Sequence, residues 1–408
     1  MATKRKDEKG RVLKEGESHR SDGRYQYRYN LGNGKRHVVY ANSLSELRDK
    51  EEEIQRKLFD NIKTTADSVT LNELFDLYMS GKTELKQSTR TNYNYMYKNY
   101  IKDCIGYKKI ATIKFSAIKK FYNSLIQEKN FKPNSMEIVN TILHPIFTLA
   151  VRDGYIRTNP TDGVMSEIKK GHNWEKPKRH ALTLQEQEKF INFVSNSKTY
   201  NHWLPLLTVF LGTGCRVGEI VGLRWEDCDF EDSTISINHN LVYRQQDSGE
   251  CEFHVTTPKT SAGIRSVPML SEVKKALLQE KRKQMEMGFN VTAIDGYTNF
   301  IFTNKVGYIH NPQTINRAIK RIILASNLEE EEKAKLEHRS PILIRDFSVH
   351  NLRHTFCTRL CENESNLKVI QDVMGHADIT TTMNIYAEAT KDKKKEVFSQ
   401  LEGKIKIS

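Results

Sequence analysis

Residues 350–386 begin His350-Asn351-Leu352-Arg353-His354-Thr355, continue through Gly375-His376-Ala377-Asp378 and end at Tyr386. Positions three apart on a helix share a face, so the His350 imidazole and the Arg353 guanidinium would point into one site. A phosphate oxygen suits both groups. Tyr386 follows His376 by ten residues, a spacing that could bring its hydroxyl to the same phosphate. The stretch therefore predicts helices joined by short loops around a phosphate-binding site.

This arrangement resembles the C-terminal signature of the tyrosine recombinases, the lambda-integrase-type site-specific recombinases. Two upstream segments extend the resemblance. Gly212-Thr213-Gly214-Cys215-Arg216-Val217-Gly218-Glu219-Ile220 resembles the first-arginine box of that family. Thr257-Pro258-Lys259-Thr260, followed by Arg265-Ser266-Val267-Pro268, resembles its catalytic-lysine hairpin. All the motif positions are present in the order of the family.

The resemblance implies DNA cleavage and rejoining without metal, cofactor or ATP. Tyr386 would be the nucleophile, forming a 3′-phosphotyrosyl link and releasing a 5′ hydroxyl. Arg216 and Arg353 would donate to the non-bridging oxygens of the phosphate. His350 and His376 would assist through hydrogen bonds, and Lys259 would protonate the leaving oxygen. Glu219 lies three residues after Arg216, on the same helical face, so its carboxylate could orient that guanidinium.

Blander interpretations of the same residues remain. Taken one by one, Arg353 fits a surface arginine, His350 a structural histidine and Tyr386 a half-buried helix residue. The ligand types at His350, His354, Cys357 and Cys361 also suggest zinc. Four ligands along one helix would span roughly 16 Å, too far for a single tetrahedral ion. We therefore expect the two cysteines to pack instead.

The whole chain is basic. It has 408 residues, enough for two or three domains, and a formal charge of +13, which favours a nucleic-acid partner. Six scattered cysteines fit a reducing compartment better than a disulfide scaffold. No signal peptide and no apolar run near the roughly twenty residues of a membrane span are present. We expect a soluble protein with no membrane partner, in the bacterial cytoplasm and on the nucleoid when bound to DNA.

Residues 1–62 are expected to form a first domain. The first forty residues hold eleven Lys or Arg against five Asp or Glu, a net charge of +6. Two strands, 25–30 and 36–40, and a helix from Ser43 are predicted. The hairpin resembles the arm-type DNA-binding domain of conjugative-transposon integrases, which implies DNA contacts by Arg24, Tyr25, Arg28, Lys35 and Arg36. A basic surface hairpin without a DNA role is the alternative.

Residues 63–175 are expected to form a helical bundle. Thr70-Leu71-Asn72-Glu73 is a capping box, and apolar residues then recur at helical spacing through four helices, the last over about 134–151. The bundle sits where the family's SAM-like core-binding domain sits. Residues 163–179, rich in lysine, are predicted to be an irregular interdomain linker.

Residues 176–408 are expected to form a mainly helical catalytic domain with a small antiparallel sheet. Helices are predicted over 183–194, 204–211 and 271–287, and strands near 235–237, 241–243, 253–255 and 264–267. Lys259 would stand at the tip of a hairpin formed by the last two strands. The acidic stretch 329–337 is predicted to be a solvated insertion, and the tail after Tyr386 to dock in cis or on a neighbouring protomer. The predicted fold class is α+β, with three domains.

The function predicted is that of an integrase for a mobile element. Its expected partners are double-stranded DNA with core and arm-type sites, three further copies of itself in a homotetramer, and an excisionase or DNA-bending protein. A type IB topoisomerase and a catalytically silent DNA-binding regulator remain as alternatives. A metal-dependent relaxase also uses tyrosine, but its paired-histidine metal motif is missing from the sequence.

Overall fold

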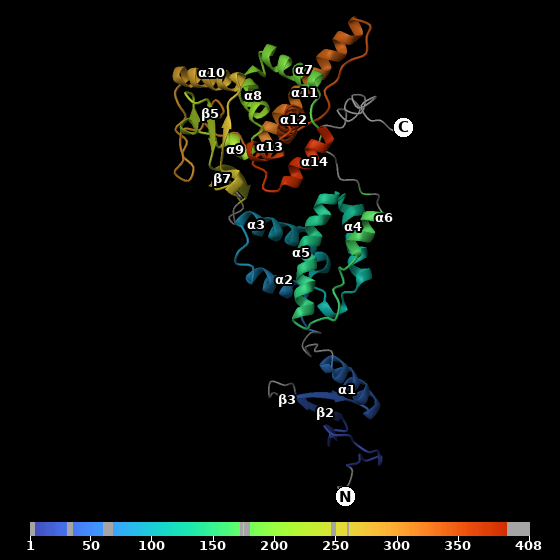
Figure 1. Ribbon diagram of the computed structural model, residues 1–408. Coiled ribbons are helices and arrows are strands. Elements are labelled where there is room, and N and C mark those ends of the chain that lie inside the picture. The colour runs from blue at the N-terminus through green and yellow to red at the C-terminus, as the bar shows by residue number, and fades with distance from the viewer. Residues whose placement is uncertain are drawn as a thin grey trace, which may run out of the picture. The chain divides into compact units, whose positions relative to one another are not determined.

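The computed structural model describes residues 5–30, 36–59, 68–171, 174, 180–245, 250–258 and 261–389. The chain divides into two compact units, Met1–Lys176 and Pro177–Ser408 (Figure 1). Lys35, Lys259 and the tail from residue 390 lie outside the described residues. No helix in these described ranges has the length and apolar character that a membrane crossing needs.

The first unit begins with a three-stranded antiparallel sheet in the order β1-β2-β3. The strands are β1 (Glu17–His19), β2 (Tyr25–Asn30) and β3 (Arg36–Ala41), and helix α1 (Leu44–Phe59) packs on them. Leu44 and Leu47 bury the face that closes the sheet. The sequence did not predict β1, because three polar residues give no strand pattern. Glu17 of β1 is buried, and its carboxylate accepts a hydrogen bond from Arg48 of α1.

A helical bundle follows in the same unit. Its helices are α2 (Leu71–Ser80), α3 (Gln87–Met96), the π-helix η1 (Tyr97–Gly106), the short η2 (Ile110–Thr112), α4 (Phe115–Lys129), α5 (Pro133–Arg152) and α6 (Val164–Gly171). The predicted capping box is present, since the Thr70 hydroxyl accepts from the Glu73 amide and the Glu73 carboxylate accepts from the Thr70 amide. The predicted aromatic faces form the core, with Tyr122 and Phe147 fully buried.

Helix α6 corrects the prediction of an irregular linker over residues 163–179. Val164, Met165 and Ile168 are buried in the core of the bundle. Lys169 forms an ion pair with Glu137 of α5. Lysines dominate the composition of this segment. Its three buried apolar residues are too few to form a helical repeat that could be recognised in the sequence.

The second unit is mainly helical. The α-helices are α7 (Leu184–Asn196), α8 (Leu204–Thr213), α9 (Val217–Val221), α10 (Ser271–Met287), α11 (Pro312–Leu336), α12 (Val349–Asn363), α13 (Leu367–Met374) and α14 (Ile379–Ala389). The unit also contains three short 3₁₀ turns, η3 (Asn201–Trp203), η4 (Trp225–Asp227) and η5 (Ser261–Gly263). Helix α8 is central, as predicted, because Leu207, Val209 and Phe210 are buried and it packs against both α10 and α12 (Figure 1).

The strands of the second unit form two small sheets instead of the single predicted sheet. One sheet has the order β4-β5-β8, from Cys228–Asp229, Thr234–Ile237 and Arg265–Pro268. The other pairs β6 (Asn240–Gln245) with β7 (Cys251–Thr256). The prediction of a hairpin with Lys259 at its tip was therefore wrong: the flanking strands β7 and β8 pair with different partners.

The acidic stretch 329–337 also differs from its prediction. It continues helix α11 up to Leu336 and is not a separate insertion. Ala334 is buried, and the Glu330 carboxylate forms ion pairs with Lys189 of α7 and with Arg339. These contacts hold the end of α11 against its own unit, so this part of the stretch is structural.

Candidate active site

Arg216 lies at the junction of α8 and α9. Gly214 ends α8 in the left-handed conformation, at φ 60°, where a side chain is disfavoured. Arg216 then caps α9: its amide donates to Glu219 Oε2 at 2.8 Å and its Nη1 donates to Glu219 Oε1 at 2.7 Å. Its Nη2 donates to the Gly375 carbonyl at 2.7 Å. The predicted contact between Glu219 and Arg216 is present, and the Arg216 side chain remains 41% exposed.

Arg353 comes from the first turns of α12 and is 5% exposed. Its Nη1 donates to the Gly214 carbonyl at 2.7 Å and its Nη2 to the Met374 carbonyl at 2.6 Å. Burial, followed by the positive charge of Arg216, lowers the pKa of Arg353 to about 10. The guanidinium therefore stays charged at neutral pH, although it is held away from water.

His376 follows the turn that ends α13, where Gly375 has φ 62°. The imidazole is 7% exposed, and its Nδ1 lies 2.9 Å from the Thr382 hydroxyl of α14. Burial lowers the pKa of His376 to about 4, and the charges of Arg353 and Arg216 contribute further. His376 is thus a neutral imidazole at pH 7. His350, in the first turn of α12, is exposed but close enough to contribute to this pKa shift.

Tyr386 lies on α14 and is half-buried. It packs on a small apolar cluster formed by Cys357, Cys361, Ile370 and Met374. Thr382, the partner of His376, is four residues earlier on the same helix, so the two side chains share a face. The bond between His376 and Thr382 therefore fixes the helix that carries the phenol beside the histidine turn.

Sequence reasoning missed the role of Arg265, which it treated only as part of a returning strand. This guanidinium is 6% exposed and lies against Glu219, with Nη2 donating to Oε2 at 3.0 Å and Nη1 to Oε1 at 3.3 Å. Burial alone would raise the pKa of Glu219, but the bonds and charge of Arg265, with Arg216, lower it to about 2. We call Arg216, Glu219, Arg265 and Arg353 the arginine cluster.

The arginine cluster, His376 and Tyr386 thus come together in the second unit, whereas Lys259 lies outside the described residues. Across the ranges that the structure covers, no group of three or more His, Cys, Asp or Glu could hold a metal ion. Cys357 and Cys361, which the sequence predicted to pack, are buried in the apolar cluster.

The predicted DNA-contacting residues of the first unit divide into two classes. Arg24, which immediately precedes β2, Arg28 of β2 and Arg36 of β3 are exposed. Tyr25 is 5% exposed and belongs to the core, which corrects its prediction as a DNA contact. Its hydroxyl donates to Asp7 at 2.9 Å and accepts from Arg11 at 2.7 Å. Alternation along β2 places one aromatic face inward, and the pattern alone could not tell which residue was exposed.

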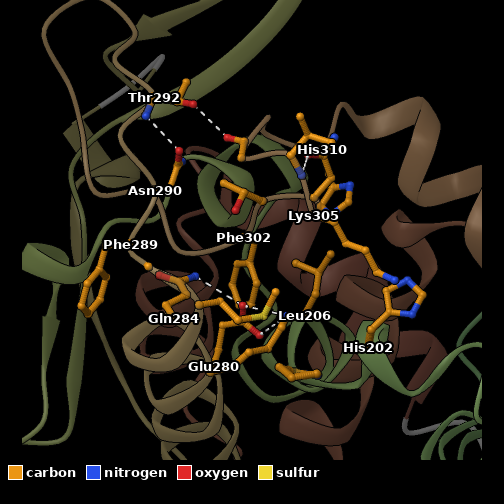
Figure 2. A pocket seen from close by; sticks show the side chains of 18 of the residues that line it. His202, Leu206, Glu280, Gln284, Phe289, Asn290, Thr292, Phe302, Lys305 and His310 are labelled. Carbon is orange, nitrogen blue, oxygen red and sulfur yellow. Dashed lines mark hydrogen bonds and ion pairs between the residues drawn. The ribbon is translucent and has the colours of Figure 1, made fainter.

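A cavity of about 690 Å³ lies elsewhere in the second unit, between α8, α10 and the segment that precedes α11 (Figure 2). His202, Leu206, Gln284, Phe302 and His310 are among its lining residues. Its lining includes no member of the arginine cluster and neither His376 nor Tyr386. The candidate active site is therefore a separate part of the unit.

Comparison with known proteins agrees with this geometry. The phage integrase family model matches residues 180–393, the DNA-binding domain of Tn916 integrase matches 1–58, and the phage integrase N-terminal SAM-like domain matches 70–126. The transposase from transposon Tn1545 of Streptococcus agalactiae is 32% identical, covering 96% of this chain and 95% of its own.

Solved structures are similar as well. The Tn1549 transposon integrase in complex with transposon right end DNA is 29% identical at a TM-score of 0.70, covering 82% of this chain and all of that one. A lambda integrase dimer bound to a core site shares the fold at 20% identity and a TM-score of 0.54, over 92% and 95% of the two chains. The chain therefore belongs to the phage integrase family of tyrosine recombinases, site-specific enzymes that break and rejoin DNA.

Proposed function

We propose that this recombinase integrates and excises a mobile DNA element through a covalent 3′-phosphotyrosyl intermediate at Tyr386. One observation carries the assignment of the site. Arg216 and Arg353 donate to the consecutive carbonyls of Gly375 and Met374, immediately before His376. The motifs that contain Arg216, Arg353 and His376 are far apart in the sequence, yet they meet at the turn after α13. The next helix, α14, carries the phenol of Tyr386.

The two guanidiniums suit the charge that develops during phosphoryl transfer. In the transition state negative charge spreads over the non-bridging oxygens. Each guanidinium has five N–H donors in a planar fork, so Arg216 and Arg353 retain donors for phosphate beyond those they use on carbonyls. Lysine could not duplicate that fork. The low exposure of Arg353 strengthens its interaction with a bound phosphate, because little water screens it.

The tyrosine needs help with its proton. An unperturbed phenol has a pKa near 10, so few molecules ionise at neutral pH. His350, exposed at the start of α12, is the proposed proton acceptor, and the neutral imidazole of His376 is proposed to hydrogen-bond a phosphate oxygen. Lys259 is the proposed acid for the departing 5′ oxygen. These side chains supply every step, so the proposal includes no metal or cofactor.

The proposed partners are a core site, an arm-type site and three further copies of the chain. The Tn1549 integrase was solved with transposon right end DNA, and lambda integrase forms a tetramer on a Holliday junction. The proposed arm contacts are Arg24, Arg28 and Arg36, which are exposed in or directly beside the N-terminal sheet, together with Lys35. We place the protein in the bacterial cytoplasm, where an excisionase or a DNA-bending protein would assist it.

A suicide DNA substrate carrying the junction of the parent element tests the function. The substrate has a nick close to the cleavage site, so that the released fragment diffuses away and the covalent complex accumulates. We expect protein on the 3′ phosphate and a free 5′ hydroxyl on the released fragment of the same strand. Protein linked to a 5′ phosphate would contradict the proposal. Relaxation of plasmids that lack the junction would instead favour a type IB topoisomerase.

A further inference from the structure

Glu219 is shared by two guanidiniums in the second unit. Arg216 donates to it at 2.7 Å and Arg265 at 3.0 Å, and the carboxylate is only 3% exposed. The arginine cluster therefore holds three positive charges and one negative charge, with a net charge of +2. A carboxylate this close to Arg216 would by itself cancel the positive charge that a phosphate must meet. A further positive charge has to neutralise the Glu219 carboxylate if Arg216 is to offer its own charge to the phosphate.

Arg265 is in a position to do this because all three of its guanidinium nitrogens donate to acceptors of the protein. Its side chain is 6% exposed, against 41% for Arg216. Its fork is held from several sides: Nε donates to the Val373 carbonyl at 2.8 Å, Nη1 to the Gly263 carbonyl at 3.2 Å, and Nη2 lies 3.4 Å from Cys215 Sγ. The guanidinium is thus fixed against both oxygens of the carboxylate.

We propose that Arg265 is a positioning residue that neutralises Glu219, so that Glu219 can orient Arg216 without cancelling the charge that Arg216 offers to the scissile phosphate. Glu219 fixes the direction of the Arg216 fork through two bonds, to its amide and to Nη1. Arg265 supplies the balancing charge. The Arg216 side chain is thus oriented by a carboxylate whose negative charge is neutralised by a second arginine. In a single carboxylate–arginine pair, the group that orients the arginine also cancels its charge.

This inference rests on the proposed function, because it takes Arg216 to be a phosphate-binding group. The role of Arg265 is additional to the proposed function, since Arg265 touches neither substrate nor nucleophile in the proposed chemistry. Its consequence is that the rate of cleavage follows the net charge of the arginine cluster. That charge is +2 in the natural chain and would be +1 in Arg265→Met, +2 in Arg265→Lys and +2 in the double variant Arg265→Met with Glu219→Gln.

The experiment measures single-turnover cleavage on the suicide substrate, with core-site DNA affinity and thermal unfolding recorded for every variant. We expect Arg265→Met to cleave roughly 10² to 10³-fold more slowly, the loss typical of one missing electrostatic group in a preorganised site, with DNA affinity unchanged. Arg265→Lys should keep most of the rate. The double variant should cleave faster than Arg265→Met, although it has lost one more native side chain.

A matched control separates charge from folding. Arg345 pairs with the largely buried Glu186 at 2.7 Å, outside the arginine cluster. Arg345→Met also removes an arginine from a largely buried carboxylate, although Arg345 itself is 53% exposed, so it should lower the thermal midpoint but leave the cleavage rate within about threefold. If Arg265 only held the fold together, Arg265→Met would cleave at the natural rate at temperatures where it is fully folded, and that result would overturn the proposal.

A modified substrate gives a second readout. A methylphosphonate at the scissile position replaces one charged non-bridging oxygen by a neutral methyl group and leaves nucleophile and leaving group unchanged. The ratio of natural to Arg265→Met rates should shrink to less than about tenfold on it, because less charge has to be met. An undiminished ratio would contradict the proposal. Arg216→Ala cleaving normally would instead refute the proposed function, so the two failures are distinguishable.

Discussion

The hydroxyl of Tyr386 is the group on which the proposed chemistry depends most directly. Tyr386→Phe removes one oxygen and keeps the ring that packs on the cluster around Cys357 and Met374. We therefore expect covalent attachment to DNA to disappear, while binding of the core site and the thermal midpoint stay unchanged. Denaturing gels for the adduct and a mobility shift for binding measure the two outcomes.

Tyr297 and Tyr308 are suitable controls for this substitution. Both are tyrosines of the same unit outside α14, and Tyr308 is 66% exposed. Their phenylalanine variants should form the adduct as the natural chain does. A denaturant-resistant adduct from Tyr386→Phe would mean that another residue attacks. It would leave the silent-regulator alternative excluded but the nucleophile unassigned.

His376 makes stability depend on pH in a defined window. Its pKa is lowered from 6.5 to about 4 in the folded chain, so between these values the unfolded chain binds the proton and the folded chain does not. The free energy of unfolding therefore falls as pH drops from about 6.5 to about 4, by at most about 3 kcal/mol from this residue. It is fully retained above pH 6.5.

His376→Gln should flatten that dependence. Urea unfolding at pH 7, 5.5 and 4.5 would show a smaller loss of stability on acidification in the variant than in the natural chain. Some loss should remain, because burial also lowers the pKa of His310. Glu219 and Glu186, whose pKa values lie near 2, lose their contributions only below about pH 4.5. An equal slope in both proteins would show that His376 titrates normally.

The turn after α13 is the element that brings the arginines and the histidine together. Gly375 has φ 62°, and a Cβ there would lie 2.9 Å from Arg265 Nη1 and 3.1 Å from the Ala262 carbonyl. Gly375→Ala thus combines a strained backbone with displacement of the fork that balances Glu219. We expect destabilisation by about 1 to 3 kcal/mol and a loss of cleavage of at least tenfold.

Gly296→Ala is the matched control for this turn. Gly296 also has a positive φ, of 82°, but a Cβ there would meet no atom within 4 Å. The Gly296→Ala variant should lose stability only through backbone strain, and it should cleave at the natural rate once folded. Equal cleavage by the two alanine variants would show that the close approach at Gly375 is not needed for the site.

Local signals in the sequence were enough for many of these elements. The capping box of α2 and both ends of α10 agree with the structure, because caps and apolar repeats act within a few residues. Strand pairing was not predictable in the same way: β8 joins β5 and not its neighbour β7, a choice made by contacts distant in sequence. Arg265 was missed for the same reason, since its partners Glu219 and Val373 lie 46 and 108 residues away.

The chain as a whole concentrates positive charge at its start. Its first forty residues carry a net charge of +6, out of +13 for all 408 residues. The three-stranded sheet in this part of the chain has its own small core. The bundle and the second unit have separate cores. Arm-type binding and strand cleavage should therefore be separable by deletion.

Deleting residues 1–62 should abolish recognition of the arm-type site and spare cleavage at the core site. Each phosphate contact that the segment makes adds roughly 0.9 to the slope of log affinity against log salt, so the full chain should lose arm-site affinity steeply between 50 and 200 mM salt. Replacing Arg24, Arg28 and Arg36 by glutamine in the full chain should reduce that slope by up to about 2.7. Titration of both DNA sites at several salt concentrations measures the slopes, with the core site as internal control. A truncated chain that binds both sites as the full chain does would show that the basic sheet has no part in DNA recognition.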